Sequence, residues 1–322
     1  MDSVKPYDEV MAQNDAFIQP QNNELTQKNI HQNQSLQENS LKDEQLIGDL
    51  LVRLGKMKPQ DVERILTTQL DKNLAFGEAA KRLGLISEQD IQQALAHQFD
   101  YPYLHKSNEL ASGKKFSQAL FAAYAPFSDK GEILRDLRSQ LLMRWFDKGN
   151  KTLAITSVNA SDKSCELAAN LAIIFSQLGK KTLLVDANLR QPKQHQLFNL
   201  DNKLGLSNKL INRATTDSIV QIAELSNLSV LTAGSLAPNP TELLERANFA
   251  ALLDELSEIY EIVIVDTAPF SVGSDAITVA MRAKGMLPTV TKDASRLEDV
   301  QLFIKQSKIA GIETVGFVLQ DK

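Results

Sequence analysis

Three polar segments could bind a nucleotide, and each directly follows or ends an apolar run. Lys163 and Ser164 come shortly after the run 152–156, and Asp186 and Asp266 lie near the ends of two later runs. A lysine at such a place can reach the β- and γ-phosphates of a nucleotide, and the next hydroxyl can bind Mg²⁺. A carboxylate at a strand end can hold Mg²⁺ or orient a nucleophile. Together these residues predict a site for a nucleotide and a divalent cation.

The loop before Lys163 departs from the usual phosphate-binding sequence, whose glycines let backbone N–H groups surround phosphate oxygens. In the frame G-x-x-x-x-G-K-[ST], Ser157 takes the place of the first glycine and Asp162 that of the second. At about 4 Å and an effective dielectric constant near 20, Asp162 and a phosphate would repel each other by roughly 4 kcal/mol. An ordinary strand-to-helix turn is therefore the alternative interpretation. The candidate nucleotide contacts are Ser157, Asn159, Asp162, Lys163, Ser164 and Cys165.

Either aspartate also has a simpler interpretation, as a helix cap or a turn residue. Asp186 lies in the segment LLVDANLR (183–190), and Asp266 lies in VIVDTAP (263–269), where Pro269 would fix the following turn. The case for a shared site therefore depends on the fold that brings these segments together.

The segments between these residues predict that fold. Six apolar runs alternate with helical patterns from residue 151 onward, and continuous apolar runs are typical of strands covered on both faces. The alternation predicts an α/β fold with a doubly wound, mostly parallel sheet, in which ligands bind at the carboxyl ends of the strands. Pro288 interrupts one run, where it would remove a ladder hydrogen bond. The runs are 152–156, 181–187, 228–234, 261–268, 285–290 and 314–319, and the helical patterns include 165–179, 240–258 and 296–309.

Two copies of a helical repeat precede this part of the chain. Residues 47–69 align with residues 76–98, so that Gly55 matches Gly84, and apolar residues recur at helical spacing in each copy. Each copy predicts two helices joined by a turn at that glycine, where left-handed backbone ends a helix. Ser87 is a candidate helix cap, and Pro59 suits the first turn of a helix. We expect a small helical domain over residues 43–104.

Three further segments complete the predicted organisation. Residues 1–42 are rich in Gln and Asn and predict a disordered tail, with a partner-binding tail as the alternative. Residues 105–128 predict a linker, and residues 129–322 predict the α/β domain. That domain begins with an amphipathic helix over 131–146. Its expected apolar side consists of Ile133, Leu134, Leu137, Leu141, Leu142 and Trp145.

Composition restricts the classes of function. The chain has 322 residues and a formal net charge of -5, which disfavours general affinity for nucleic acid. Its one cysteine, Cys165, excludes an internal disulfide and a thiolate metal cluster. No apolar run reaches the roughly 18 residues that span a bilayer, and no signal-peptide pattern is present. We expect a cytoplasmic protein that a partner could hold at the inner face of the plasma membrane.

Four segments, taken in order, resemble the bacterial tyrosine kinases of exopolysaccharide export, which are relatives of the MinD and ParA ATPases. The resemblance covers residues from about 46 to 322, and the layout is most similar to the chain-length-determinant kinases. It implies a P-loop NTPase fold, ATP and Mg²⁺ as cofactors, and phosphorylation of tyrosines in trans. The segments are TLAITSVNASDKS (152–164), LLVDANLRQPKQH (183–195), GSLAPNPTELL (234–244) and VIVDTAPFSVGSDA (263–276).

The resemblance also assigns roles within the site. It implies a Walker A motif around Lys163 and Ser164, a Walker A′ motif around Asp186 and a Walker B motif around Asp266. Lys163, Asp186 and Asp266 would be catalytic, and Ser164, Asp186 and Asp266 would hold Mg²⁺. Asn188 stands where Walker A′ usually carries a second acidic residue, and it lacks the charge useful for a metal or for activating a tyrosine.

Partners follow from the same resemblance. Family members form rings with the cytoplasmic end of a membrane-spanning chain-length regulator of polysaccharide export, through a Glu-x-x-Arg-x-x-Arg helix. Here that pattern is Glu132, Arg135 and Arg138, which share one helix face suited to intersubunit ion pairs, and a solvated face is the alternative. The repeat domain resembles the N-terminal domain of type II secretion and pilus-assembly ATPases. Some of these bind cyclic di-GMP, but Leu46 and Ala75 replace the arginines of that pattern, which disfavours this ligand.

Two main hypotheses follow. In the first, the chain is an ATP-dependent tyrosine kinase with a divergent phosphate loop, and Lys163, Ser164, Asp186 and Asp266 act by positioning and charge neutralisation. In the second, it is a pseudokinase scaffold of the export machinery that keeps the fold but binds ATP weakly or not at all. A MinD-like positioning ATPase is a third hypothesis.

Overall fold

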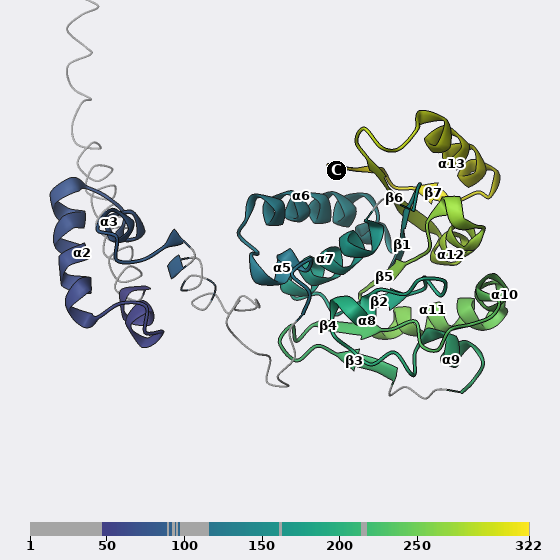
Figure 1. Cartoon of the computed structure of the whole chain (residues 1–322), viewed down its shortest axis with the longest axis horizontal. Helices are drawn as coiled ribbons and strands as arrows, with labels where there is room; N and C mark the ends of the chain where they lie inside the picture. Colours follow the sequence, from purple (N-terminus) through teal and green to yellow (C-terminus); the bar gives the residue numbers. More distant parts are fainter. Residues whose placement is uncertain are drawn as a thin grey trace, which may run out of the picture. The chain divides into compact units, whose positions relative to one another are not determined.

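The computed structural model describes residues 47–88, 90, 91, 94, 96, 116–160, 163–213 and 218–321 (Figure 1). The predicted tail 1–42 lies outside these ranges, as do Leu46 and Asp162. The chain divides into two compact units, Met1–Asp100 and Tyr101–Lys322. Among the described residues, none of the helices has the length and apolar character required to span a bilayer.

The described part of the first unit is built from the two repeats, with α2 (Pro59–Lys72) and α3 (Phe76–Arg82). Gly55 and Gly84 have φ angles of 67° and 66°, which confirms the predicted left-handed turns. Ser87 is a helix cap as predicted, because its hydroxyl accepts the Asp90 N–H at 3.2 Å while Asp90 Oδ2 accepts the Ser87 N–H at 3.0 Å.

Close helix packing explains a second pair of repeated glycines. A Cβ at Gly48 would lie 3.3 Å from Val62 Cγ1, and a Cβ at Gly77 would lie 3.0 Å from Ile91 Cδ1. Val62 and Ile91 hold the same position in the two copies, so the first helix of each copy packs on the second in the same way. The core of the unit includes Leu51, Ile65, Phe76 and Ala80.

The second unit is the predicted α/β domain, and its fold class is confirmed. The strand order is β3-β4-β2-β5-β1-β6-β7, with β8 beside β6, and only the pair β3–β4 is antiparallel. The strands are β1 (Thr152–Ser157), β2 (Thr182–Asp186), β3 (Ile219–Gln221), β4 (Leu228–Leu231), β5 (Ile262–Asp266), β6 (Gly285–Thr291), β7 (Glu313–Thr314) and β8 (Val318–Gln320).

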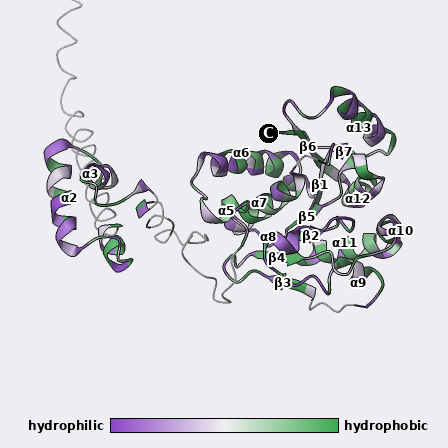
Figure 2. Cartoon of the chain, viewed as in Figure 1, coloured by the Kyte–Doolittle hydropathy of each residue, from purple (hydrophilic) through white to green (hydrophobic). Residues whose placement is uncertain are grey.

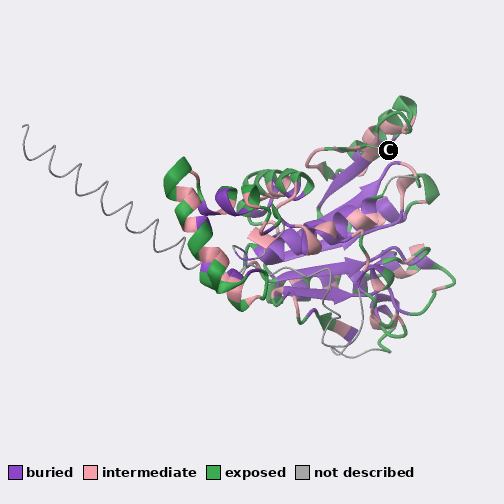
Figure 3. Ribbon diagram, turned by 60° about the vertical axis from the view of Figure 1, so that its left-hand side comes forward, coloured by how far each residue is buried: buried purple, intermediate pink, exposed green. Residues whose placement is uncertain are grey.

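Helices cover both faces of this sheet, so that its central strands are buried (Figure 3). One core cluster joins the sheet to α5, α6 and α7 and includes Leu141 and Ile155. A second cluster joins the other face to α11, α12 and α13 and includes Leu253, Val279 and Phe303. The helices of this unit are α5 (Phe121–Tyr124), α6 (Asp129–Arg144), α7 (Ser164–Gln177), α8 (Gln194–Leu197), α9 (Leu206–Leu210), α10 (Pro240–Glu245), α11 (Ala247–Ile259), α12 (Asp275–Ala283) and α13 (Leu297–Ile309).

Several predicted elements differ from the structure. The single helix expected over 240–258 is wrong, because Arg246 is extended (φ -62°, ψ 148°) and separates α10 from α11. On α6, hydrophobic and hydrophilic residues alternate (Figure 2), and Leu134, Leu141 and Trp145 are buried as predicted. Ile133 is 66% exposed, so its assignment to the apolar side is wrong.

Pro288 does not interrupt the sheet, and β6 runs through it. Met286 O accepts the Val315 N–H on the β7 side, whereas Thr289 O accepts the Val158 N–H at the β1 side. Since backbone polar groups alternate along a strand, the missing N–H of Pro288 falls on the side of β7 and β8. There it lies between the residues paired with β7 and those paired with β8, where no register partner is assigned. The ladder with β1 is therefore preserved.

The last residues of the predicted linker are part of the second unit and pack on its sheet and helices. Phe116 and Leu120 are buried in the core cluster that contains α7, and α5 begins at Phe121. Asn170 of α7 holds this segment, because its Oδ1 accepts the Ala122 N–H at 2.9 Å and its Nδ2 donates to Ala119 O at 2.9 Å.

Candidate functional site

A row of polar side chains lies at the carboxyl ends of four neighbouring strands. Asp186 of β2 is the register partner of Asp266 of β5, and Asp266 is also the partner of Ile155 in β1. Ser157 of β1 is the partner of Thr289 in β6. Register partners project to the same face of a parallel sheet, and residues two apart in a strand share that face. All four polar residues therefore lie on the face of Ile155, which α7 covers.

Asp186 is completely buried and caps α8. Its Oδ2 accepts the N–H groups of Lys193 and Gln194 at 3.1 and 3.0 Å, and its Oδ1 accepts that of Asn188 at 3.2 Å. Burial raises the pKa of Asp186 to about 7, although these three hydrogen bonds oppose the rise. Asp186 therefore makes the contacts that the simpler interpretation, a helix cap, predicts.

Asp266 has a different environment. Its Oδ2 accepts a hydrogen bond from Gln194 Nε2 at 2.7 Å, whereas its Oδ1 is buried and has no partner in the described part of the chain. Burial, and then the charge of Asp186, raise the pKa of Asp266 well above its ordinary value. A buried carboxylate oxygen without a donor is costly, and it is an atom that a cation or a water molecule could satisfy.

Ser157 stands where the phosphate-loop sequence usually has its first glycine, and its backbone conformation does not require one. Ser157 is the last residue of β1, in extended backbone, so its Cβ creates no strain there. The Ser164 hydroxyl, at the start of α7, donates to Ser157 Oγ at 3.4 Å. Lys163 directly precedes α7 and is exposed, and Asn159 is half-buried.

Cys165 takes part in the site through its backbone. Its carbonyl accepts a hydrogen bond from Gln194 Nε2 at 3.0 Å. Burial raises the pKa of the thiol to about 12, so the sulfur stays protonated at neutral pH and is a poor nucleophile. Gln194 and Thr289 are site residues that sequence reasoning missed, and the only local signal for Gln194 is its place eight residues after Asp186.

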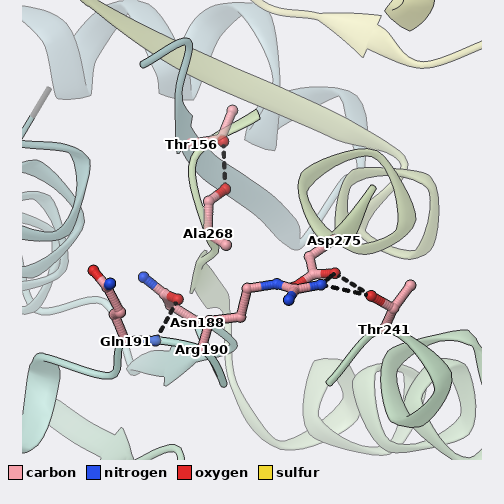
Figure 4. Close-up of polar contacts among 7 residues, drawn as sticks. All are labelled: Thr156, Asn188, Arg190, Gln191, Thr241, Ala268 and Asp275. Atoms are coloured by element: carbon pink, nitrogen blue, oxygen red, sulfur yellow. Dashed lines mark hydrogen bonds and ion pairs between the residues drawn. The ribbon is translucent and has the colours of Figure 1, made fainter. Parts of the chain in front are cut away.

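A second polar group fixes the loop after β2. Figure 4 shows Arg190 reaching Asp275, the first residue of α12, and Thr241 of α10. Arg190 Nε donates to Asp275 Oδ2 at 2.7 Å, and Nη2 donates to Asp275 Oδ1 at 3.1 Å and to Thr241 Oγ1 at 3.0 Å. Asn188 Oδ1 accepts the Gln191 N–H at 3.1 Å, so this side chain closes the turn.

The predicted oligomerisation residues lie apart from this row, on α6. Glu132 is exposed and forms a two-point ion pair with Arg135 of the same chain. Arg135 Nη1 also donates to Pro126 O at 2.6 Å, and Arg138 Nη1 donates to Ile174 O at 3.3 Å. The two arginines are thus half-buried and bonded within the chain.

The residues present fit a cation whose remaining ligands are water molecules or the phosphates of a nucleotide. Within the described ranges, no group of three or more His, Cys, Asp or Glu side chains could hold a metal ion on its own. Mg²⁺, however, is usually held by one or two carboxylates together with substrate phosphates and water. Asp186, Asp266 and the Ser164 hydroxyl provide such a set, and the partnerless Oδ1 of Asp266 is the atom best placed to serve.

Comparisons with known proteins identify the family of the chain. No family model matches the chain. It is 32% identical over 210 residues to the putative tyrosine-protein kinase CapB of Staphylococcus aureus. These residues make up 65% of this chain and 92% of CapB. It is 29% identical over 202 residues to a putative tyrosine-protein kinase in the cps region of Klebsiella pneumoniae, but it spans only 28% of that longer protein.

A solved structure gives the same result. The kinase domain of the Escherichia coli tyrosine kinase ETK superposes with a TM-score of 0.61 at 27% identity, over 69% of this chain and 89% of that domain. The matched part of the chain is thus a nearly complete kinase domain of this type. The chain belongs to the bacterial tyrosine-protein kinase family.

Proposed function

We propose that the α/β unit binds Mg·ATP at the carboxyl ends of β2, β5 and β1 and transfers the γ-phosphoryl group to a tyrosine of another chain. The observation that carries this proposal is the pair of neighbouring buried carboxylates, Asp186 and Asp266, one oxygen of which has no partner among the residues that the structure describes. Two adjacent buried carboxylates cost stability. A sheet end with a purely structural role would be more stable with neutral side chains.

Each residue has a distinct part in this reaction. Lys163 would neutralise charge on the phosphates. Ser164, Asp266 and, through a water molecule, Asp186 would hold a Mg²⁺ ion, which would supply further charge stabilisation to the phosphoryl group. The tyrosine oxygen attacks the γ-phosphorus, the bond between the γ-phosphorus and the bridging oxygen breaks, and ADP leaves with that oxygen. Asp186, the carboxylate next to Asp266 in the sheet, would accept the tyrosine proton.

A scaffold without ATP binding is the competing function, and one contact favours it. The Ser164 hydroxyl, which should face Mg²⁺, donates to Ser157, the residue in place of the first glycine. The hydroxyl would have to leave this partner to bind the cation. Asp162, in place of the second glycine, adds a like charge next to the expected phosphates.

The two functions differ in nucleotide affinity. A fluorescent ATP analogue with Mg²⁺ is titrated into the full chain, into Lys163→Ala, and into Lys148→Ala, which changes an exposed lysine before the start of β1. The kinase requires binding in the micromolar range that Lys163→Ala loses and Lys148→Ala keeps. Absence of binding at millimolar nucleotide would establish the scaffold. Recovery of binding in the double variant Ser157→Gly with Asp162→Gly would assign the defect to the loop.

The proposal extends to the setting of this kinase. We infer that it acts in the cytoplasm on exopolysaccharide export, held at the membrane by a chain-length regulator, and that it oligomerises through Glu132, Arg135 and Arg138. Glu132 is the exposed member of the three and is available to a neighbouring copy. Light scattering should show a smaller assembly for Glu132→Ala, but not for Asp136→Ala, which changes an exposed carboxylate on the same helix. Equal masses for both variants would exclude this contact.

A further inference from the structure

Gln194 is a buried polar residue that contacts both carboxylates of the site. It has no exposed surface and is the first residue of α8. Its backbone N–H donates to Asp186 Oδ2 at 3.0 Å, and its side-chain Nε2 donates to Asp266 Oδ2 at 2.7 Å. The same Nε2 donates to Cys165 O at 3.0 Å. One residue thereby connects the ends of β2 and β5 with the first turn of α7.

The orientation of this amide follows from its neighbours. Asp266 Oδ2 and the Cys165 carbonyl are both acceptors, so the end of the amide that meets them must be the NH₂ group. Its oxygen, Gln194 Oε1, is therefore directed away from them, and it is buried without a donor in the described part of the chain. Asp266 Oδ1 is likewise buried without a donor among these residues. Two hydrogen-bonded side chains thus each keep one buried oxygen without a partner.

Two buried oxygens without donors destabilise the folded state unless a ligand binds to them. An apolar side chain at position 194 would remove one of the two. Oxygen atoms of carboxylates, amides and water are the ligands that hard divalent cations prefer. The two free oxygens are therefore of the right type to receive a cation and its water.

We propose that Gln194 is a positioning residue for the divalent cation of this site. Its NH₂ group fixes Asp266 through Oδ2 and so reserves Oδ1 for the cation, while Gln194 Oε1 accepts a hydrogen bond from a water molecule bound to that cation. The inference rests on the proposed function, since it assigns the cation to Asp266. Partners that orient a metal ligand typically contribute 10- to 100-fold to metal affinity, and this is the size of effect expected here.

The test measures cation affinity on the full chain without nucleotide. Mn²⁺ is titrated, and the free ion is followed by electron paramagnetic resonance. The site is identified as the binding that Asp266→Asn removes. We expect Gln194→Leu to weaken that binding by about 10- to 100-fold, and Gln194→Met, which keeps the length of the side chain without its donor, to do the same.

Two matched controls separate positioning from stability. Gln196→Leu makes the same change at an exposed residue of α8. Gln177→Leu removes a buried amide that donates to Ala122 O at 3.0 Å, far along α7 from the carboxylates, and it should lower the melting temperature without changing Mn²⁺ affinity.

The outcomes separate this inference from the proposed function. The inference would be overturned if Gln194→Leu or Gln194→Met bound Mn²⁺ as tightly as the wild type. It would also be overturned if Asp266→Asn removed no Mn²⁺ binding from the wild type. Because no nucleotide is present, a chain that binds Mn²⁺ in this way but never binds ATP would support the role of Gln194 and contradict the kinase.

Discussion

At the scale of single residues, the two buried carboxylates of the proposed site lower the stability of the folded chain. Asp186 obtains three backbone donors from the start of α8 and the preceding turn, whereas Asp266 obtains the Gln194 amide alone among the described residues. Both have raised pKa values because they are buried, and the pKa of Asp266 is raised further by Asp186. A group whose charged form is disfavoured in the folded state makes stability depend on pH.

The first prediction is that Asp266→Asn stabilises the protein above neutral pH. An unfolded Asp has a pKa near 3.9, and that of folded Asp266 is higher, so the folded state keeps a proton that the unfolded state loses. The associated stability is complete below about pH 4 and is lost as the pH rises through the folded pKa. Asparagine still accepts from Gln194 but cannot ionise. The free energy of unfolding at about pH 8 should therefore exceed that of the wild type.

Urea denaturation without divalent cations, at several values between about pH 5 and 8, measures this difference. The wild type should lose stability over that range, and Asp266→Asn should lose less. Asp254→Asn, at an exposed position of α11, is the control and should follow the wild type. Parallel pH curves for the wild type and Asp266→Asn would contradict the prediction.

At the scale of elements, the sheet was predictable and several contacts were not. Continuous apolar runs located β1, β2 and β5 within a residue or two at each end, because strands covered on both faces have this pattern. The carboxyl-end rule correctly brought Asp186 and Asp266 together. The break at Arg246 was missed because no glycine or proline occupies it, and only its extended backbone ends α10.

Gln194 shows why the rest of the site could not be predicted. Its role depends on the register of β2 with β5 and on the position of α8, which bring residues 194 and 266 to within hydrogen-bond distance. A local pattern carries no information on such a contact. By itself, a glutamine in a polar segment reads as an exposed residue.

A second prediction concerns the packing of β6 on Trp145, the residue that follows α6. A Cβ at Gly285, the first residue of β6, would lie 2.2 Å from Trp145 Cη2, and Trp145 is held by its Nε1 hydrogen bond to Thr152 O at 2.8 Å. Gly285→Ala should therefore lower the free energy of unfolding by about 1–3 kcal/mol, as overpacking does. Gly316→Ala is the control, because the nearest atom to its Cβ would be 4.0 Å away. Equal urea midpoints for the two variants would refute the proposed clash.

A third prediction concerns the ion pair that joins the loop after β2 to α12. Arg190→Met would leave Asp275, which is 1% exposed, without its guanidinium partner. Removing one partner of a buried pair costs about 3–5 kcal/mol, but Arg190 is partly exposed and Thr241 still donates to Asp275, so we expect about 1–3 kcal/mol. Arg296→Met, at an exposed arginine, should have little effect.

A double variant tests the pairing itself. Adding Asp275→Asn to Arg190→Met should cost less than the sum of the two single changes, because the second change removes the charge that the first left unpaired. Strict additivity in urea denaturation would show that the two side chains do not act together.

At the scale of the whole molecule, two units with separate cores make up the described chain. The boundary between the units determines which residues belong to the core of the α/β unit. The sequence predicted a linker up to residue 128, because residues 105–128 contain Ser, Gly and Lys. The segment 116–128 nevertheless buries Phe116, Leu120 and Ala122 against the α/β unit.

The fourth prediction is that the fragment 105–322 unfolds at a higher temperature than the fragment 129–322. Burial of Phe116 and Leu120 contributes about 1.5–3 kcal/mol each. The shorter fragment would also leave the Asn170 side chain in α7 without the backbone groups of Ala119 and Ala122. Thermal unfolding followed by circular dichroism compares the two fragments, and Asn170→Ala in the longer one should shift its midpoint part of the way towards the shorter. Identical midpoints for both fragments would contradict the prediction, because they would show that residues 116–128 add no stability to the α/β unit.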